Sequence, residues 1–374
     1  MNKWTGLKIG HLTARIPIIQ GGMSVGISLA KLSSAVAQEG GIGVIGTAMI
    51  GMNEPDIYSN AREADIRALK KEIRSARAMT EGILGVNIMV ALTHYADLVE
   101  TSIAEGIDII FAGAGLPLDL PKYLVNGSKT KLVPIISSDR AAKIICKKWL
   151  SNFNYLPDGF VVEGPMAGGH LGFKPEQIND PDFALENIVP QVIAAVKPFI
   201  EAHAKDIPVI AAGGVYTGAD IHKYLKMGAA GIQMGTRFVA THECDASEGF
   251  KQAFVDARAE DLVLIKSPVG LPGRAIRSQF TEDIDLGIRK PFKCPYHCIK
   301  PCDYKKSPYC ISFALISARK GNMKNGFAFA GANAYRVDEI VSVKTLIESL
   351  RQEYRSACTQ PAVESMEPNI KKHA

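Results

Sequence analysis

The stretch that decides the fold is residues 207–215, which read IPVIAAGGV. An apolar run typical of a buried strand ends there in Gly213 and Gly214. Only glycine lets a backbone turn this sharply while its N–H groups come close to an anion. Residues 230–237, AGIQMGTR, repeat the pattern one unit later, with the hydroxyl of Thr236 after Gly235. One such turn is as typical of a simple tight connection, but two in adjacent units favour a phosphate site.

Similar apolar runs precede these two along the chain. We expect strands at residues 16–20, 43–46, 83–90, 107–112, 132–137, 159–163, 208–212 and 231–234. Helix-like segments lie between them, at residues 28–38, 55–79, 95–105, 118–125, 140–150, 183–203 and 219–226. Strands that are apolar throughout and joined by helices indicate a parallel sheet buried on both faces.

The size and number of these units predict an α/β protein with a (β/α)₈ TIM barrel, whose loops after the last two strands commonly bind phosphate. An open doubly wound sheet is the main alternative. Its usual Gly-x-Gly-x-x-Gly is missing after the first strand.

The alternation of strands and helices stops near residue 258. We predict a barrel core over residues 1–258, a Cys-, Gly- and Pro-rich lid or C-terminal extension over 259–355, and a disordered tail over 356–374. The extension should end in a helix over 337–355. Its loop at 267–277 carries Arg274 and Arg277, which contact either an anionic ligand or only solvent.

Composition excludes two classes of partner. The chain has 43 basic and 38 acidic residues, a net charge of +5, and the basic residues are mostly scattered, which argues against nucleic-acid binding. No stretch approaches the roughly 20 apolar residues of a membrane helix. We therefore expect a cytoplasmic protein, with isolated Cys146, Cys244 and Cys358 as reduced thiols and a homodimer left open.

Five segments in chain order resemble the nitronate monooxygenase (2-nitropropane dioxygenase) family and, equally, its relative the flavin-dependent enoyl-acyl-carrier-protein reductase II. Besides the two glycine turns, they are PIIQGGM at 17–23, GVNIM at 85–89 and VEGPMAGGHLG at 162–172. The resemblance implies a barrel that binds FMN. No motif for a covalent flavin link is present, so we expect noncovalent binding.

The resemblance also implies roles for individual residues. The backbone of Gly21, Gly22 and Met23 would line the flavin ring, and Asn87 would bond it. The remaining cofactor-binding candidates lie in the glycine motifs: Gly168, Gly169, Gly213, Gly214, Gln233, Met234, Gly235 and Thr236.

The candidate catalytic residue is His170, which two glycines would bring up to the cofactor. At a pKa near neutrality, its imidazole can take a proton from carbon or polarise a nitro or carbonyl group. The family motif has an acid where this chain has Met166, and Glu163 stands nearby but out of register.

Four cysteines cluster in the extension, at Cys294, Cys298, Cys302 and Cys310. Four thiolates within so short a segment can supply a zinc or iron–sulfur site. The spacings differ from the usual Cys-x₂-Cys runs, so buried free thiols or a disulfide are equally open.

The resemblance favours a nitronate monooxygenase, in which FMN oxidises an alkyl nitronate and O₂ reoxidises the flavin, giving a carbonyl compound and nitrite. The first alternative is an NAD(P)H-dependent reductase of an enoyl thioester. The second is a non-catalytic barrel that binds flavin or sugar phosphate.

Overall fold

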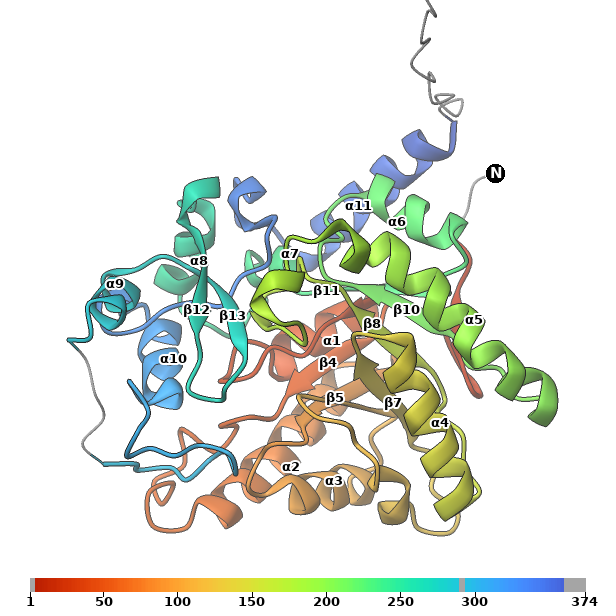
Figure 1. Cartoon of the computed structure of the whole chain (residues 1–374), viewed down its shortest axis with the longest axis horizontal. Helices are drawn as coiled ribbons and strands as arrows, with labels where there is room; N and C mark the ends of the chain where they lie inside the picture. The colour runs from red at the N-terminus through yellow and green to blue at the C-terminus, as the bar shows by residue number, and fades with distance from the viewer. Residues whose placement is uncertain (1–3, 289–292, 360–374) are drawn as a thin grey trace, which may run out of the picture.

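The computed structural model describes residues 4–288 and 293–359 (Figure 1). Its central sheet is a parallel barrel in the order β3-β11-β10-β8-β7-β6-β5-β4. These strands are β3 (Ile18–Gln20), β4 (Gly43–Gly46), β5 (Leu84–Met89), β6 (Ile109–Gly113), β7 (Lys131–Ile136), β8 (Phe160–Glu163), β10 (Val209–Ala212) and β11 (Gly231–Met234).

The barrel closes where β3 and β4, the first and last strands in this order, lie side by side. The Gln20 amide donates to the Ile42 carbonyl at 2.9 Å, and the Ile42 amide donates to the Ile18 carbonyl at 3.0 Å. The predicted TIM barrel is therefore confirmed, and every predicted strand lies within about two residues of an observed one.

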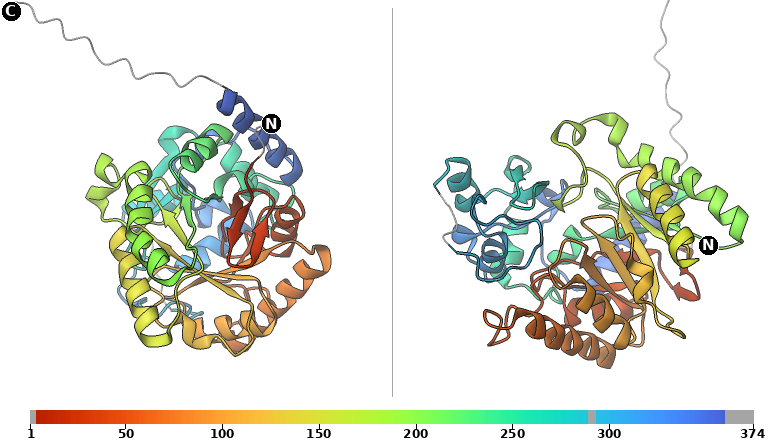
Figure 2. Two further views of the ribbon diagram at one scale, coloured as in Figure 1. Left: turned by 90° about the vertical axis from the view of Figure 1, so that its right-hand side faces the viewer. Right: turned by 60° about the horizontal axis from the view of Figure 1, so that its bottom comes forward.

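Helices surround the barrel (Figure 2). They are α1 (Ala30–Gln38), α2 (Ala61–Met79), α3 (Tyr95–Ala104), α4 (Asp139–Phe153), α5 (Leu185–His203), α6 (Gly218–Lys226) and α11 (Val343–Thr359). Side chains fix two of the helix starts. Thr217 and Asp220 form a capping box on α6, and Ser138 accepts a hydrogen bond from the Ala141 amide on α4.

Three helix predictions need correction. Residues 118–125 contain only the 3₁₀ helix Leu120–Tyr123, with Pro121 in its first turn, where the missing backbone N–H of proline is tolerated. Helix α2 begins at Ala61 rather than residue 55, after a series of turns. Helix α11 begins at Val343 rather than residue 337, because Val341 is extended and bridges to Thr241.

One end of the barrel is closed by apolar side chains. The hairpin of β1 (Leu7–Ile9) and β2 (Leu12–Ala14) places Leu7 and Ile9 in the same buried cluster as Phe111 and Val161 of the barrel interior. The carboxyl ends of the strands lie at the opposite end, which is where barrel enzymes carry their sites.

The C-terminal part contains regular elements that the sequence did not predict. Strands β12 (Leu262–Lys266) and β13 (Pro272–Ile276) form a hairpin, and β13 also pairs with β9 (Gly169–His170). Helices α7 (Thr236–Val239), α8 (Glu248–Val255), α9 (Gln279–Asp285) and α10 (Ile311–Arg319) complete this part. Short 3₁₀ helices lie at Pro175–Gln177, Pro181–Phe183, Ala259–Asp261, Met323–Asn325 and Ala334–Arg336.

Strands β12 and β13 and helices α8 to α10 lie together on one side of the barrel (Figure 1). A domain boundary at residue 258 stays a prediction, and residues on its two sides, such as Phe254 and Leu346, share one core. Helix α11 continues to Thr359, so the predicted tail does not begin at 356; residues 360–374 lie outside the described residues. Within residues 4–288 and 293–359, no helix has the length and apolar character to cross a membrane.

Candidate active site

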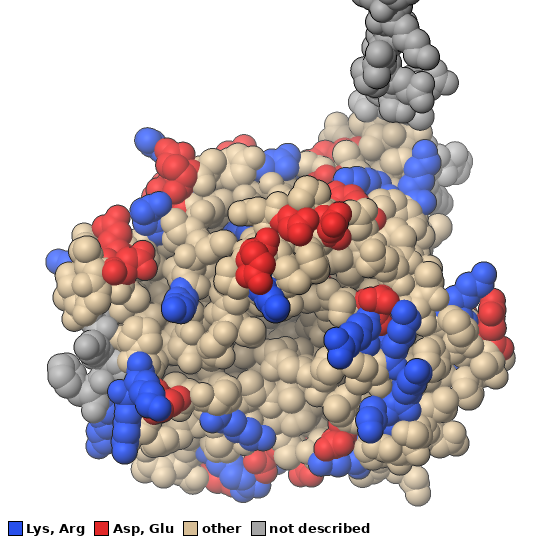
Figure 3. All heavy atoms as spheres, in the orientation of Figure 1, with Lys and Arg blue, Asp and Glu red and all other residues tan. Residues whose placement is uncertain are grey.

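A cavity of about 290 Å³ opens at the carboxyl ends of the barrel strands. It is lined by His170 and by eleven of the predicted cofactor-binding residues: Gly21, Gly22, Met23, Gly168, Gly169, Gly213, Gly214, Gln233, Met234, Gly235 and Thr236. Asn87 lies directly behind Gly22, where a Cβ would collide with the Asn87 side chain. Figure 3 views the molecule from the side of the barrel and shows a recess near the middle of this view, with charged side chains around it.

Unpaired backbone amides mark one part of the cavity wall. The N–H groups of Gly213, Gly214, Gly235 and Thr236 donate no hydrogen bond to any protein acceptor in the part of the chain that the structure describes. Gly214 holds φ at +101°, and its turn is fixed by Asn333, whose side-chain amide donates to the Gly214 carbonyl at 2.7 Å. Orphaned amides need an acceptor, and an anion satisfies several of them at once. This wall fits the phosphate that the sequence predicts.

His170 lies on β9, where pairing with β13 fixes its backbone. Its Nε2 lies 2.7 Å from Ser267 Oγ, and its ring packs edge-on against Phe329 with centroids 5.0 Å apart. Burial lowers the pKa of His170 to about 4. The expected pKa near neutrality is therefore wrong, because the protein environment takes water away from the charged form. At pH 7 the imidazole is neutral.

Glu163 is the acid that stands near the glycine–histidine motif but out of register with the acid of the family motif. It ends β8 and lines the same cavity, and its carboxyl group has no hydrogen-bond or ion-pair partner among the described residues. Burial raises the pKa of Glu163 to about 7. Its position at the carboxyl end of a barrel strand is a signal that sequence reasoning could have used.

The two arginines of the 267–277 loop do not line the cavity. Arg274 is buried on β13, and its Nη1 donates to the carbonyls of Pro165 at 2.6 Å and Ala167 at 2.8 Å. Arg277 is largely exposed and reaches the Glu260 carbonyl at 3.3 Å. Arg274 therefore shapes the loop that carries Met166, and a Cβ at Gly214 would lie only 2.9 Å from Met166 Cβ.

The wall opposite the barrel is apolar. Its side chains come from the C-terminal part of the chain: Phe250, Phe254, Ile299, Ile311, Leu315 and Phe329, together with Cys298 and Ser312. Among the described residues that line the cavity there is no lysine or arginine, and Glu163 is the one acid. Tyr216, which lines the cavity, is contacted by two cations: the guanidinium groups of Arg237 and Arg336 stack on its ring at 4.6 and 4.4 Å.

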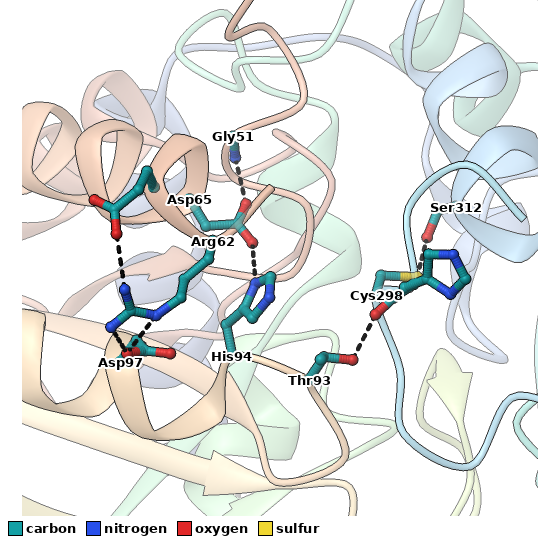
Figure 4. Close-up of polar contacts among 10 residues, drawn as sticks. Gly51, Arg62, Asp65, Thr93, His94, Asp97, Cys298 and Ser312 are labelled. Carbon is teal, nitrogen blue, oxygen red and sulfur yellow. Dashed lines mark hydrogen bonds and ion pairs between the residues drawn. The ribbon is translucent and has the colours of Figure 1, made fainter. Parts of the chain in front are cut away.

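The four clustered cysteines are all free thiols. Within residues 4–288 and 293–359, no three His, Cys, Asp or Glu side chains are arranged to hold a metal ion. The structure thus gives no support to a mononuclear zinc site. Cys298 contacts Ser312, with Sγ 3.0 Å from its Oγ (Figure 4).

Known proteins resemble this chain over most of its length. A family model described as nitronate monooxygenase matches residues 6–353. A *Mycobacterium tuberculosis* protein named (3aS,4S,5R,7aS)-5-hydroxy-7a-methyl-1-oxo-octahydro-1H-indene-4-carboxyl-CoA dehydrogenase is 30% identical over 73% of this chain and 66% of its own length, just under two thirds. A probable nitronate monooxygenase of *Staphylococcus aureus* strain Newman is 26% identical over 73% of this chain and 78% of its own.

Solved structures agree on the fold. FabK from *Thermotoga maritima* is 28% identical, with a TM-score of 0.70 over 91% of this chain and 93% of its own. Nitroalkane oxidase from *Streptomyces ansochromogenes* has a TM-score of 0.71 over 92% of this chain and 97% of its own, at 21% identity, which supports the fold alone.

Proposed function

Because this chain belongs to the nitronate monooxygenase family and is a flavin-dependent oxidoreductase, we propose that its flavin is FMN and that its substrate is an acyl thioester. When bound, the flavin would exchange hydride with a carbon close to the thioester carbonyl. NAD(P)H serves as the source of hydride in the reducing direction.

The observation that carries this proposal is the uncharged, apolar cavity wall opposite the barrel, which we call the cap wall. A nitronate is an anion, and a buried anion needs a cation or a set of aligned donors to replace its water. No lysine or arginine lines the described cavity, and His170 is neutral at pH 7. An acyl chain instead gains free energy by leaving water for such a surface. The name of the *M. tuberculosis* relative, a CoA-thioester dehydrogenase, agrees with this substrate class.

FMN fits the residues present. The unpaired amides of Gly213, Gly214, Gly235 and Thr236 would hold its phosphate, and Gly21, Gly22 and Met23 would lie along its ring. When bound, the flavin accepts and donates hydride. The protein supplies the binding, the orientation and the protons.

Two side chains on the wall can handle those protons. Addition of hydride to one carbon of an enoyl thioester requires a proton on the neighbouring carbon. His170 is neutral and lies within hydrogen-bond distance of Ser267, so a ring nitrogen can accept a proton. Glu163, with a pKa of about 7, exists in both protonation states at neutral pH and is the second candidate.

The test is anaerobic reduction of the flavin. We expect NADH or NADPH to bleach the bound flavin and crotonyl-CoA to restore its colour, while propionate 3-nitronate has no effect. Bleaching by the nitronate, with none by either nucleotide, would overturn the thioester proposal.

Nitronate oxidation is the second candidate, and it is favoured by the family match over residues 6–353. A neutral His170 at pH 7 is also the form that a general base requires. The anaerobic assay above separates the two functions. The non-catalytic barrel considered from the sequence finds no support, because the family consists of enzymes.

A further inference from the structure

The cysteine-rich segment forms part of the cavity wall and is tied to the barrel. The Thr93 amide donates to the Cys298 carbonyl at 3.1 Å, and the Lys300 amide donates to the Ala91 carbonyl at 2.9 Å. Between them, Leu92 and Ile299 form an antiparallel bridge. The segment is therefore held on the loop after β5, beside the cavity (Figure 4).

The four thiols of this segment gather near the start of helix α10. Cys310 is the residue that precedes α10, and Cys298 contacts Ser312 in its first turn. Cys298 and Cys310 pack against the same apolar cluster, which contains Tyr296. Cys294 Sγ accepts a hydrogen bond from the His297 amide at 3.3 Å, and Cys302 closes a turn on the Ile299 carbonyl.

The thiols also interact electrostatically with one another. Cys310 and Cys294 both lie close enough to Cys298 to act electrostatically on its thiol. The same two cysteines act on the thiol of Cys302. All four thiols are therefore near neighbours, although they come from a segment of 17 residues.

The arrangement does not suit a single ion. A zinc ion with Zn–S bonds of about 2.3 Å needs its sulfur ligands in contact with one another, and no such group exists in the described residues. A polynuclear centre places iron and sulfide atoms between the thiolates and so accepts a wider spacing, with four cysteines as its usual ligands.

We propose that Cys294, Cys298, Cys302 and Cys310 together bind a polynuclear iron–sulfur cluster in the wall of the active-site cavity. Since Cys298 also lines that cavity, the cluster lies next to the flavin site. The proposal does not depend on the substrate proposed above, because cluster assembly needs only the four thiols.

The experiment is anaerobic reconstitution of the full chain with ferrous iron and sulfide. We expect about two or about four irons per chain with equal sulfide, and an electron paramagnetic resonance signal after dithionite reduction. The iron count distinguishes the two cluster types. Fewer than about one iron per chain, one zinc without sulfide, or a disulfide between two of these cysteines would each overturn the proposal.

Variants assign the ligands. Cys302→Ser and Cys310→Ser should each lower bound iron at least about fivefold. Cys358→Ser is the matched control, because Cys358 is also half-buried but contacts His222 on another part of the chain. It should keep the full iron content. Flavin content of each variant reports whether the barrel has folded, and a folded C302S or C310S variant with wild-type iron content would contradict the assignment.

Discussion

The two walls of the cavity are built in different ways. The barrel wall presents backbone amides from the glycine turns after β10 and β11, whereas the cap wall presents apolar side chains from residues 250–329. Backbone donors depend on a few glycines and suit a cofactor phosphate. Side chains change shape and polarity with each substitution and suit the selection of a substrate. The comparison assigns cofactor binding to one wall and substrate choice to the other.

The largest effect on cofactor affinity should come from filling the barrel wall. Gly214→Val forces an L side chain into a backbone with φ of +101° and against Met166. Displacing two amides from the phosphate loses roughly 3 kcal/mol, so FMN affinity should fall at least about 100-fold. Titration of flavin fluorescence measures it.

The matched control is Gly106→Ala. Gly106 also has positive φ, at +70°, but a Cβ there meets nothing within 4 Å. It should cost about 1 kcal/mol of unfolding free energy and leave FMN affinity unchanged. Equal losses of FMN affinity in both variants would mean that backbone strain, rather than the amides, explains the effect.

Removal of the imidazole should affect turnover and leave cofactor binding intact. His170→Ala should lower kcat about 100- to 1000-fold, because the proton relay is lost. Ser267→Ala keeps the imidazole but removes its 2.7 Å partner, so a fall of about tenfold is expected. Steady-state kinetics with crotonyl-CoA, alongside flavin content, gives both values. Full activity in His170→Ala would remove His170 from the mechanism.

A smaller effect should appear on the cap wall. Leu315→Ala removes apolar surface that faces the cavity. KM for a medium-chain thioester should rise about five- to tenfold, with FMN affinity unchanged. Leu286→Ala is the control, because that side chain is 74% exposed and lies outside the cavity lining. A cap variant that loses FMN but keeps its thioester KM would reverse the assignment of the two walls.

Glu163→Gln should change the pH dependence of stability. The pKa of Glu163 is 4.5 in the unfolded chain and about 7 in the folded protein, so the folded state binds the proton more tightly. The resulting stabilisation relative to the unfolded chain is fully present below pH 4.5. That contribution is lost as the pH rises through about 7. Relative to Glu163→Gln, the flavin-free wild type should lose roughly 2 to 3 kcal/mol of unfolding free energy between pH 4 and pH 8. Urea unfolding measures this, and parallel curves would contradict the raised pKa.

The sequence predicts the barrel wall well and the cap wall poorly. Apolar strands and glycine turns such as Gly213 and Gly214 are local signals, and their positions in the barrel follow from the fold. Asn333, which holds the Gly214 turn, comes from an irregular segment more than 100 residues further along the chain. No pattern in the neighbouring residues predicts such a long-range contact.

The pKa of His170 and the partners of Arg274 could not be predicted from the sequence either. The motif located His170, but its lowered pKa arises from burial beneath Phe329 and the β12–β13 hairpin. The sequence left open whether Arg274 contacts an anionic ligand or only solvent, and the tertiary structure instead turns it toward two backbone carbonyls. Both outcomes depend on contacts between segments far apart in the chain.

The most direct test of the central claim compares the affinities of the flavin-free protein for FMN and for riboflavin, which differ only in the phosphate. If the four unpaired amides of Gly213, Gly214, Gly235 and Thr236 bind that phosphate, FMN should bind at least about 100-fold more tightly. Riboflavin affinity within about threefold of that for FMN would contradict the account.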